Sequence, residues 1–247
     1  MGLERAVEEI VSAVNEYGFC VVPGVLTSED TARLREIIDE LREKESQPGG
    51  GELGHQRVLH LAAKHRAFVD LMCHTLTTVV YEKYLGPDFV CSTWTSNTAL
   101  PNADLTYWHV DHPYWTIAPP YPVDPPLTAH AIWCLDDFGR DNGATKFVPG
   151  SHRRPHLPEH NGNYDHEGVI VEASAGSLIV AHGAIWHTAG HNMTSRPRTA
   201  IFGRFARSFI VLQEDMKRQL AAVDSPSPLV ERLFGKQQYV PQRGLPY

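Results

Sequence analysis

Two histidines and one aspartate stand out in this 247-residue sequence, because together they can bind a transition metal. His109 and Asp111 are separated by one residue, and His187 follows 78 positions after His109. Two imidazoles and one carboxylate can occupy one face of an octahedral metal ion and leave the opposite face open, which suits non-heme Fe(II) oxygenases. Side chains alternate along a β-strand, so both residues of the pair could reach one ion while Val110 points away.

The segment around His187 makes a metal site the stronger interpretation. Taken alone, the His-x-Asp pair is equally explained by a histidine hydrogen-bonded to a carboxylate. Residues 178–180 form a short apolar run and residues 198–202 begin another strand, so His187 falls on a loop or strand end between them. Arg198 lies 11 residues after His187, and its planar guanidinium can bind a carboxylate through two parallel hydrogen bonds.

Three groups of residues resemble the phytanoyl-CoA dioxygenase family of Fe(II)- and 2-oxoglutarate-dependent oxygenases. The first is the Tyr-Trp-His-Val-Asp run at 107–111. The second comprises residues 135–137, 141–144 and 148–152. The third is His187, Asn192 and Arg198 in the family's order and spacing. A weaker match covers residues 17–26, so the resemblance extends over most of the chain.

The resemblance implies a role for each residue at a matching position. His109, Asp111 and His187 would be the Fe(II) ligands and the catalytic centre, and Arg198 would hold the distal carboxylate of 2-oxoglutarate. Fe(II) would be the cofactor and 2-oxoglutarate and O2 the cosubstrates, with succinate and CO2 released. The implied fold is a double-stranded β-helix, a jelly-roll or cupin-like core with flanking N-terminal helices.

The chain departs from the family's pattern at two positions beside the ligands. Val110 stands where many members have glutamine, and Ala189 stands where many have serine or threonine. The metal triad is unaffected, but the secondary contacts to 2-oxoglutarate must differ. Thr106, three residues before His109, or Asn97 on the preceding strand could supply a hydrogen bond to the cosubstrate.

Candidate substrate-binding residues follow Asp111. Residues 113–126 contain six prolines, which cannot complete a central β-ladder, so this segment is predicted to be a loop. Because the loop starts two residues after a ligand, we favour a lid or pocket wall over a stiff surface connection, with Tyr114 and Trp115 covering the substrate. His130, on a later strand, is either a pocket residue or a hydrogen-bonded core histidine.

Apolar spacing divides the chain into a helical and a strand-rich region. It predicts helices at residues 4–16, from 27 or 28 onward, at 64–84 and at 209–220. Strands are predicted at residues 19–22, 89–98, 105–111, 128–135, 144–148, 168–172, 177–181 and 198–206. Helices followed by many strands favour an α+β domain built on a β-sandwich or barrel. We expect one domain over 1–247, with a helical part at about 1–86, a jelly-roll core at about 87–206 and a helical tail at about 207–247.

Bulk properties restrict the partners and the location. The formal net charge of −7 argues against nucleic-acid binding, which needs a basic face. No apolar stretch is long enough to cross a membrane, and the N-terminus lacks the basic and apolar regions of a signal peptide. The four cysteines show no Cys-x-x-Cys pairing and are predicted to be reduced thiols, which favours a cytoplasmic location. The oligomeric state stays open.

The expected reaction is hydroxylation of a partly apolar small molecule, such as an amino-acid derivative or a natural-product intermediate. The same iron centre could instead perform desaturation, epoxidation or ring rearrangement. Halogenation is disfavoured, because related halogenases replace the carboxylate ligand by a small residue and Asp111 is present. A Zn(II) hydrolase with these ligands would need a general base beside the metal-bound water, and no motif in the sequence indicates one. This alternative would also leave Arg198 without a function. A non-catalytic binding protein on this fold need not keep all three ligands.

Overall fold

The computed structural model describes residues 2–45, 52–104, 107–118, 120 and 124–236. Thr106 and part of the proline-rich segment 113–126 therefore lie outside the described residues. The strands are β1 (Phe19–Val22), β2 (His55–Val58), β3 (Val90–Ala99), β4 (Thr128–Cys134), β5 (Thr145–Phe147), β6 (Val169–Ile170), β7 (Leu178–His182), β8 (His187–Ala189) and β9 (Arg198–Ala206). The α-helices are α1 (Leu3–Tyr17), α2 (Ser28–Glu45), α3 (Arg66–Met72), α4 (Thr75–Leu85), α5 (Met216–Leu220) and α6 (Pro228–Leu233).

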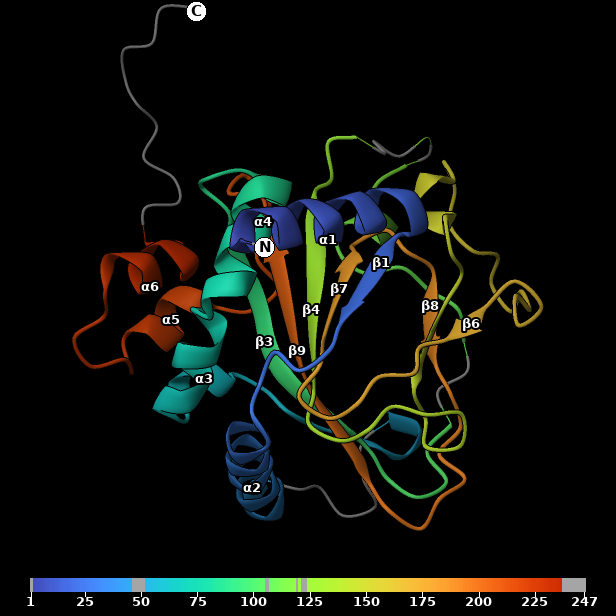
Figure 1. The fold of residues 1–247 in the computed structure, drawn as a ribbon, viewed down its shortest axis with the longest axis horizontal. Coiled ribbons are helices and arrows are strands. Elements are labelled where there is room, and N and C mark those ends of the chain that lie inside the picture. Colours follow the sequence, from blue (N-terminus) through green and yellow to red (C-terminus); the bar gives the residue numbers. More distant parts are fainter. Residues whose placement is uncertain (1, 46–51, 105–106, 119, 121–123, 237–247) are drawn as a thin grey trace, which may run out of the picture.

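Two antiparallel sheets form the centre of the molecule. The larger sheet has six strands in the order β1-β7-β4-β9-β3-β2, and the smaller has three in the order β6-β5-β8. Most helices gather on one side of the large sheet, and the small sheet lies on the other side (Figure 1). This α+β jelly-roll arrangement is the predicted fold class. The strand predicted at 19–22 is β1, whereas β2 was not predicted.

Alternating side chains give the large sheet two different apolar faces. Trp133 and Phe205 belong to a cluster that also contains buried residues of α1, α3, α4 and α6. Ile132 and Ala200, which lie an odd number of positions away on the same strands, pack in a second cluster with Phe147 of the small sheet. A period of two along a strand separates these faces. The second cluster fills the space between the sheets, where the candidate site residues also lie.

Local signals in the sequence explain two boundaries of the N-terminal helices. Thr27 caps α2, because its Oγ1 accepts a hydrogen bond from the backbone N–H of Asp30 at 3.1 Å. Gly18 ends α1 with a φ of 89°, a left-handed conformation that favours glycine. A Cβ atom at Gly18 would also lie 2.7 Å from Nδ1 of His152, so a larger residue would have to displace that ring.

Three expectations about the elements are wrong. The helix predicted at 64–84 is two helices, α3 and α4, because His74 adopts a ψ of 132° that no α-helix accepts. The spacing of apolar residues did not reveal this break, since both helices bury their apolar sides in the same cluster. The helix predicted at 209–220 is reduced to α5, which begins only where Asp215 accepts a hydrogen bond from the N–H of Arg218 at 2.9 Å.

The third correction concerns the strand predicted at 105–111. Within residues 107–111 the structure has no strand, and His109 forms a single antiparallel bridge with His187. Trp108 and Val110 alternate with His109 as the pattern requires, but they are buried in a separate apolar cluster beside Trp186. The alternation is therefore real, although only one residue pair of the ladder forms.

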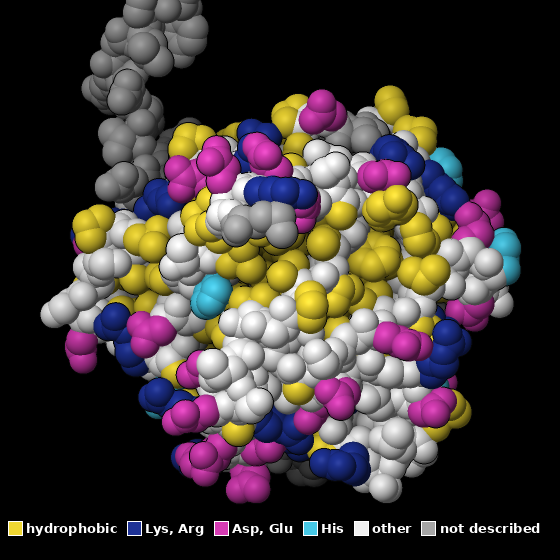
Figure 2. All heavy atoms as spheres, in the orientation of Figure 1, with side chains coloured by type: hydrophobic (Ala, Val, Ile, Leu, Met, Phe, Trp, Pro, Cys, Tyr) yellow, Lys and Arg dark blue, Asp and Glu magenta, His cyan; other side chains and the backbone are white. Residues whose placement is uncertain are grey.

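One face of the molecule is shown in Figure 2. Apolar side chains gather near its centre, below α1 and close to β1, while most charged side chains lie towards the edges (Figure 2). Among the described residues, no helix combines the length and the apolar character that a membrane span requires.

Candidate metal centre

The structure brings the three predicted ligands together. His109, Asp111 and His187 each offer one ligand atom, and these atoms all lie within 4.8 Å of one another. The backbone holds His109 opposite His187 through two hydrogen bonds of 3.0 and 2.9 Å. Asp111 follows two residues later, while Val110 between them is buried in the neighbouring apolar cluster. A local bridge therefore does the positioning that was expected of a complete strand.

Both histidines are oriented through their Nδ1 atoms. Nδ1 of His109 lies 3.1 Å from the carbonyl oxygen of Tyr107, and Nδ1 of His187 lies 2.9 Å from that of Ile185. A carbonyl only accepts, so each ring donates from Nδ1 and keeps the lone pair of Nε2 for a metal. Burial and the nearby His187 lower the pKa of His109 to about 4, so this imidazole is neutral near pH 7.

Asp111 is held as a carboxylate. Burial alone would raise its pKa, but the positive charge of Arg204 holds the pKa well below its usual value. Nη2 of Arg204 forms an ion pair with Oδ2 of Asp111, and Nε2 of His187 lies 3.5 Å from the same oxygen. One carboxylate and two imidazole donors with an open side fit Fe(II).

Arg198 is a buried cation with unused hydrogen-bond donors. The residue is 2% exposed, and its guanidinium lies 4.4 Å from the ring centroid of Phe138. Nη2 donates to the carbonyl of Gly143, whereas Nε and Nη1 have no partner. Burial lowers the pKa of Arg198 to about 10, so the side chain is still charged near pH 7. Buried donors without partners are costly, and a carboxylate ligand would satisfy them.

Asn97 and His55 lie beside Arg198. Register places His55 opposite Ala99 and Ala99 opposite Arg198, so the three residues stand at one level of the sheet. Nδ1 of His55 lies 3.2 Å from Oδ1 of Asn97, and Nε2 of His55 has no partner. Burial first, and then the charge of Arg198, lower the pKa of His55 to about 4. Sequence reasoning missed His55, because β2 carries no motif.

The three predicted substrate residues occupy different places. His130 is 7% exposed, and its Nε2 lies 3.6 Å from Oδ2 of Asp111. Trp115 is 49% exposed, with its ring 6.3 Å from that of His112. Tyr114 is fully buried, and its hydroxyl accepts a hydrogen bond from the N–H of Leu127 at 2.9 Å. The structure therefore brings His130 to the ligands and Trp115 to the surface.

These observations indicate which kind of small molecule the site can bind. A metal with an open face can take a chelating ligand, and the unpartnered donors of Arg198 suit a carboxylate. 2-Oxoglutarate has both groups, and the enzymes that use it in this way are the iron- and 2-oxoglutarate-dependent oxygenases of jelly-roll fold. The family model described as phytanoyl-CoA dioxygenase (PhyH) matches residues 14–200, and the chain belongs to this family.

Related sequences agree with this class. The dioxygenase af480 of Aspergillus fumigatus is 27% identical over 205 residues, which cover 78% of this chain and 64% of that protein. The uncharacterized protein Rv1501 of Mycobacterium tuberculosis is 29% identical over 233 residues, which cover 87% of this chain and 81% of the relative. The chain is an iron- and 2-oxoglutarate-dependent dioxygenase.

Solved structures show the same fold at low identity. The epimerase SnoN, in complex with Fe3+, alpha ketoglutarate and nogalamycin RO, has a TM-score of 0.66 and 20% identity, covering 98% of this chain and 93% of SnoN. HygX from Streptomyces hygroscopicus, with nickel, 2-oxoglutarate and hygromycin B bound, has a TM-score of 0.68 and 18% identity. That match covers 83% of this chain and 89% of HygX. At these identities, the likeness establishes the fold.

Proposed function

We propose that this enzyme hydroxylates a partly apolar small molecule, while 2-oxoglutarate is converted to succinate and CO2. The observation that carries the proposal is the pairing of an open His-Asp-His donor set with a buried arginine that has two nitrogen atoms without partners. When bound, Fe(II) supplies the activation of O2. The protein's task is to hold the reactants in the correct orientation and to exclude water from the site.

In this proposal each residue of the site has one task. His109, Asp111 and His187 hold Fe(II), and Arg198 binds the distal carboxylate of 2-oxoglutarate. Asn97 supports that carboxylate, because its side chain lies on the same face of β3 as Ala99, which is opposite Arg198. Membership of the family, with all three ligands present, favours this oxygenase over a Zn(II) hydrolase or a non-catalytic protein.

The substrate is proposed to enter beside Trp115. This tryptophan and Val211 are large exposed apolar residues, and His112 joins their segments because its Nε2 lies 2.9 Å from the carbonyl of Val211. Such a rim suits an apolar part of a substrate. His130, whose buried Nε2 has no partner, would accept a hydrogen bond from a hydroxyl or amine of the substrate. Natural-product intermediates and amino-acid derivatives combine these features.

Location and organisation complete the proposal. The four cysteines are all free, which agrees with the cytoplasm. We propose that the chain acts as one catalytic domain on a small molecule, without nucleic acid. The two structural neighbours, whose descriptions name nogalamycin and hygromycin B, are consistent with a substrate of natural-product type.

A screen for succinate release tests this function. Purified protein would be loaded anaerobically with Fe(II) and supplied with 2-oxoglutarate, O2 and a panel of natural products and amino-acid derivatives. We expect succinate to form faster with one class of compound, and the product mass to increase by one oxygen atom. Turnover that gives a product lighter by two hydrogen atoms, or of unchanged composition, would replace hydroxylation by desaturation or rearrangement. No consumption of 2-oxoglutarate under any condition would contradict the proposal.

A further inference from the structure

A second buried arginine lies on the same face of β9 as Arg198. Arg204 is six positions further along the strand, where the period of two returns a side chain to the same face, and it is 7% exposed. Its Nη2 is paired with Oδ2 of Asp111, and its Nη1 donates to Oε1 of Gln213. The two arginines therefore serve different groups. Arg198 has two nitrogen atoms without a partner, whereas Arg204 has one and is otherwise paired with Asp111 and Gln213.

Gln213 is fixed in place by the neighbouring strand. Its backbone N–H donates to Oγ of Ser92 at 3.1 Å, and the N–H of Glu214 donates to the carbonyl of Ser92 at 3.0 Å. Ser92 is fully buried in β3. A continuous series of contacts therefore runs from β3 through Gln213 and Arg204 to Asp111. A side chain held at both ends keeps its partner in one orientation better than a free one does.

We propose that Arg204, held by Gln213, is a positioning residue that fixes the Asp111 carboxylate in the orientation in which Oδ2 faces Nε2 of His187. This inference rests on the function proposed above. A carboxylate without a fixed partner can rotate, and a metal would then bind it only after that rotation is restricted, whereas a carboxylate held in place would bind more tightly.

Other groups near Asp111 cannot perform this task. His130 and His187 also face the carboxylate, with Nε2 atoms 3.6 and 3.5 Å from Oδ2. Nε2 of His187 carries the lone pair that a metal requires, and Nε2 of His130 lies beyond hydrogen-bond distance of Oδ2. Among the described residues, Arg204 is thus the charged donor that contacts Asp111.

Metal affinity in the absence of turnover tests the inference. We would measure Fe(II) binding by anaerobic titration, without 2-oxoglutarate or substrate, for the parent, Arg204→Lys and Gln213→Ala. Lysine keeps the charge but lacks the fork that spans Asp111 and Gln213. We expect Arg204→Lys to weaken Fe(II) binding by roughly ten- to a hundred-fold, the usual effect of losing a partner of a metal ligand. Gln213→Ala should act in the same direction with a smaller loss.

Arg207→Gln is the matched control. Arg207 lies three residues after Arg204, and its Nε donates to the carbonyl of Pro126 at 2.7 Å, away from Asp111. Its Fe(II) affinity should equal that of the parent. In active preparations, the ratio of succinate formed to substrate oxidised should rise for Arg204→Lys and Gln213→Ala.

Each outcome separates the inference from the proposed function. Parental Fe(II) affinity in both Arg204→Lys and Gln213→Ala would overturn the positioning role and leave the metal site intact. A loss in Arg204→Lys alone would overturn the part assigned to Gln213. If Arg204→Lys does not fold, as judged by thermal unfolding of the metal-free protein, the Fe(II) affinity of Gln213→Ala alone tests the positioning role. A parent that binds no Fe(II) would overturn the metal site itself.

Discussion

The chemistry of single residues depends here on which nitrogen of each imidazole is free. Backbone carbonyls occupy Nδ1 of His109 and of His187, and this leaves both Nε2 atoms for a metal. His191, four residues after His187, is exposed and belongs to no such arrangement. His182 instead lies against His152, with ring centroids 4.9 Å apart. Environment therefore distinguishes ligands from neighbouring histidines of the same type.

Removing a ligand should abolish metal binding. We expect His109→Ala and His187→Ala to lose Fe(II) binding in an anaerobic titration, because two donors cannot hold Fe(II) as three do. His191→Ala is the matched control and should bind iron like the parent. Iron binding by His187→Ala at parental affinity, or its loss in His191→Ala, would show that the distal ligand has been assigned to the wrong histidine.

The guanidinium of Arg198 should not be replaceable by an ammonium. Arg198→Lys removes the planar fork and its charge-assisted hydrogen bonds, worth roughly 1.5–3 kcal/mol, so we expect 2-oxoglutarate affinity to fall about ten- to a hundred-fold. Fe(II) affinity without cosubstrate should not change. Arg196→Lys, at an exposed position on the same segment, provides the control. Equal 2-oxoglutarate affinity in Arg198→Lys and the parent would remove Arg198 from the cosubstrate site.

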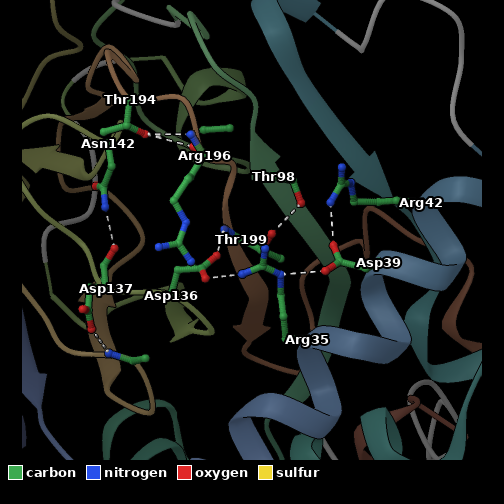
Figure 3. Close-up of polar contacts among 12 residues, drawn as sticks. Arg35, Asp39, Arg42, Thr98, Asp136, Asp137, Asn142, Thr194, Arg196 and Thr199 are labelled. Atoms are coloured by element: carbon green, nitrogen blue, oxygen red, sulfur yellow. Dashed lines mark hydrogen bonds and ion pairs between the residues drawn. The ribbon is translucent and has the colours of Figure 1, made fainter.

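At the scale of elements, helix α2 is connected to the site through a network of ion pairs. Arg35 of α2 is paired with Asp136 and with Asp39, and Asp39 is also paired with Arg42 (Figure 3). Oδ2 of Asp136 accepts a hydrogen bond from the backbone N–H of Thr199 at 2.7 Å. Thr199 is the residue after Arg198, so this network fixes the start of β9.

Asp136→Ala should therefore affect 2-oxoglutarate more than iron. The substitution leaves the buried N–H of Thr199 without its acceptor, which should lower stability by about 1–3 kcal/mol. We expect KM for 2-oxoglutarate to rise while kcat changes less, because Arg198 loses its fixed position. Asp137→Ala is the control, since the Asp137 carboxylate accepts from the N–H of Ala175 in another turn. A change in kcat alone would argue for a general loss of structure.

The segment 113–126 is the element that we expect to cover the substrate. Trp115 is half exposed near His112, which follows the ligand Asp111 directly. Trp115→Ala should raise the substrate KM and increase the succinate formed per product, because water reaches the site more easily. Fe(II) binding should stay at the parental level. A parental KM together with a parental succinate ratio would make the segment a simple surface connection.

At the scale of the whole molecule, buried neutral histidines make stability sensitive to acid. His55 has an ordinary pKa of 6.5, which burial and Arg198 lower to about 4 in the folded protein. Between these values the unfolded chain binds a proton that the folded chain excludes, so stability falls as pH falls through this range. At about 1.4 kcal/mol per pKa unit, roughly 3 kcal/mol depends on His55 staying neutral.

Denaturant unfolding of the metal-free protein would measure this effect. We expect the free energy of unfolding to decrease from neutral pH towards about pH 4, and His55→Gln to show a shallower decrease than the parent. His160→Gln, at an exposed position, should follow the parental curve. Parallel curves for His55→Gln and the parent would mean that His55 is not the group responsible.

The sequence alone was sufficient for those parts of the protein that depend on local pattern. Alternation and apolar runs predicted most strands of both sheets, and the order and spacing of His109, Asp111 and His187 predicted the three residues that the structure brings together. The role of Arg198 stays a prediction. These signals are readable because a strand's period and a ligand's chemistry are properties of neighbouring residues. The same locality explains the failure at residues 64–84, where two helices share one apolar pattern across a turn at His74.

Only the tertiary structure could decide which distant residues surround those groups. His55 reaches Arg198 because β2, β3 and β9 lie side by side in one sheet. Arg204 reaches Asp111 from another strand, and Gln213 joins them from the segment that follows β9. Nothing in the spacing of these residues marks them, because strand order and register determine which side chains meet. The three candidate ligands could be predicted from the sequence, whereas the groups that orient them could be identified only from the fold.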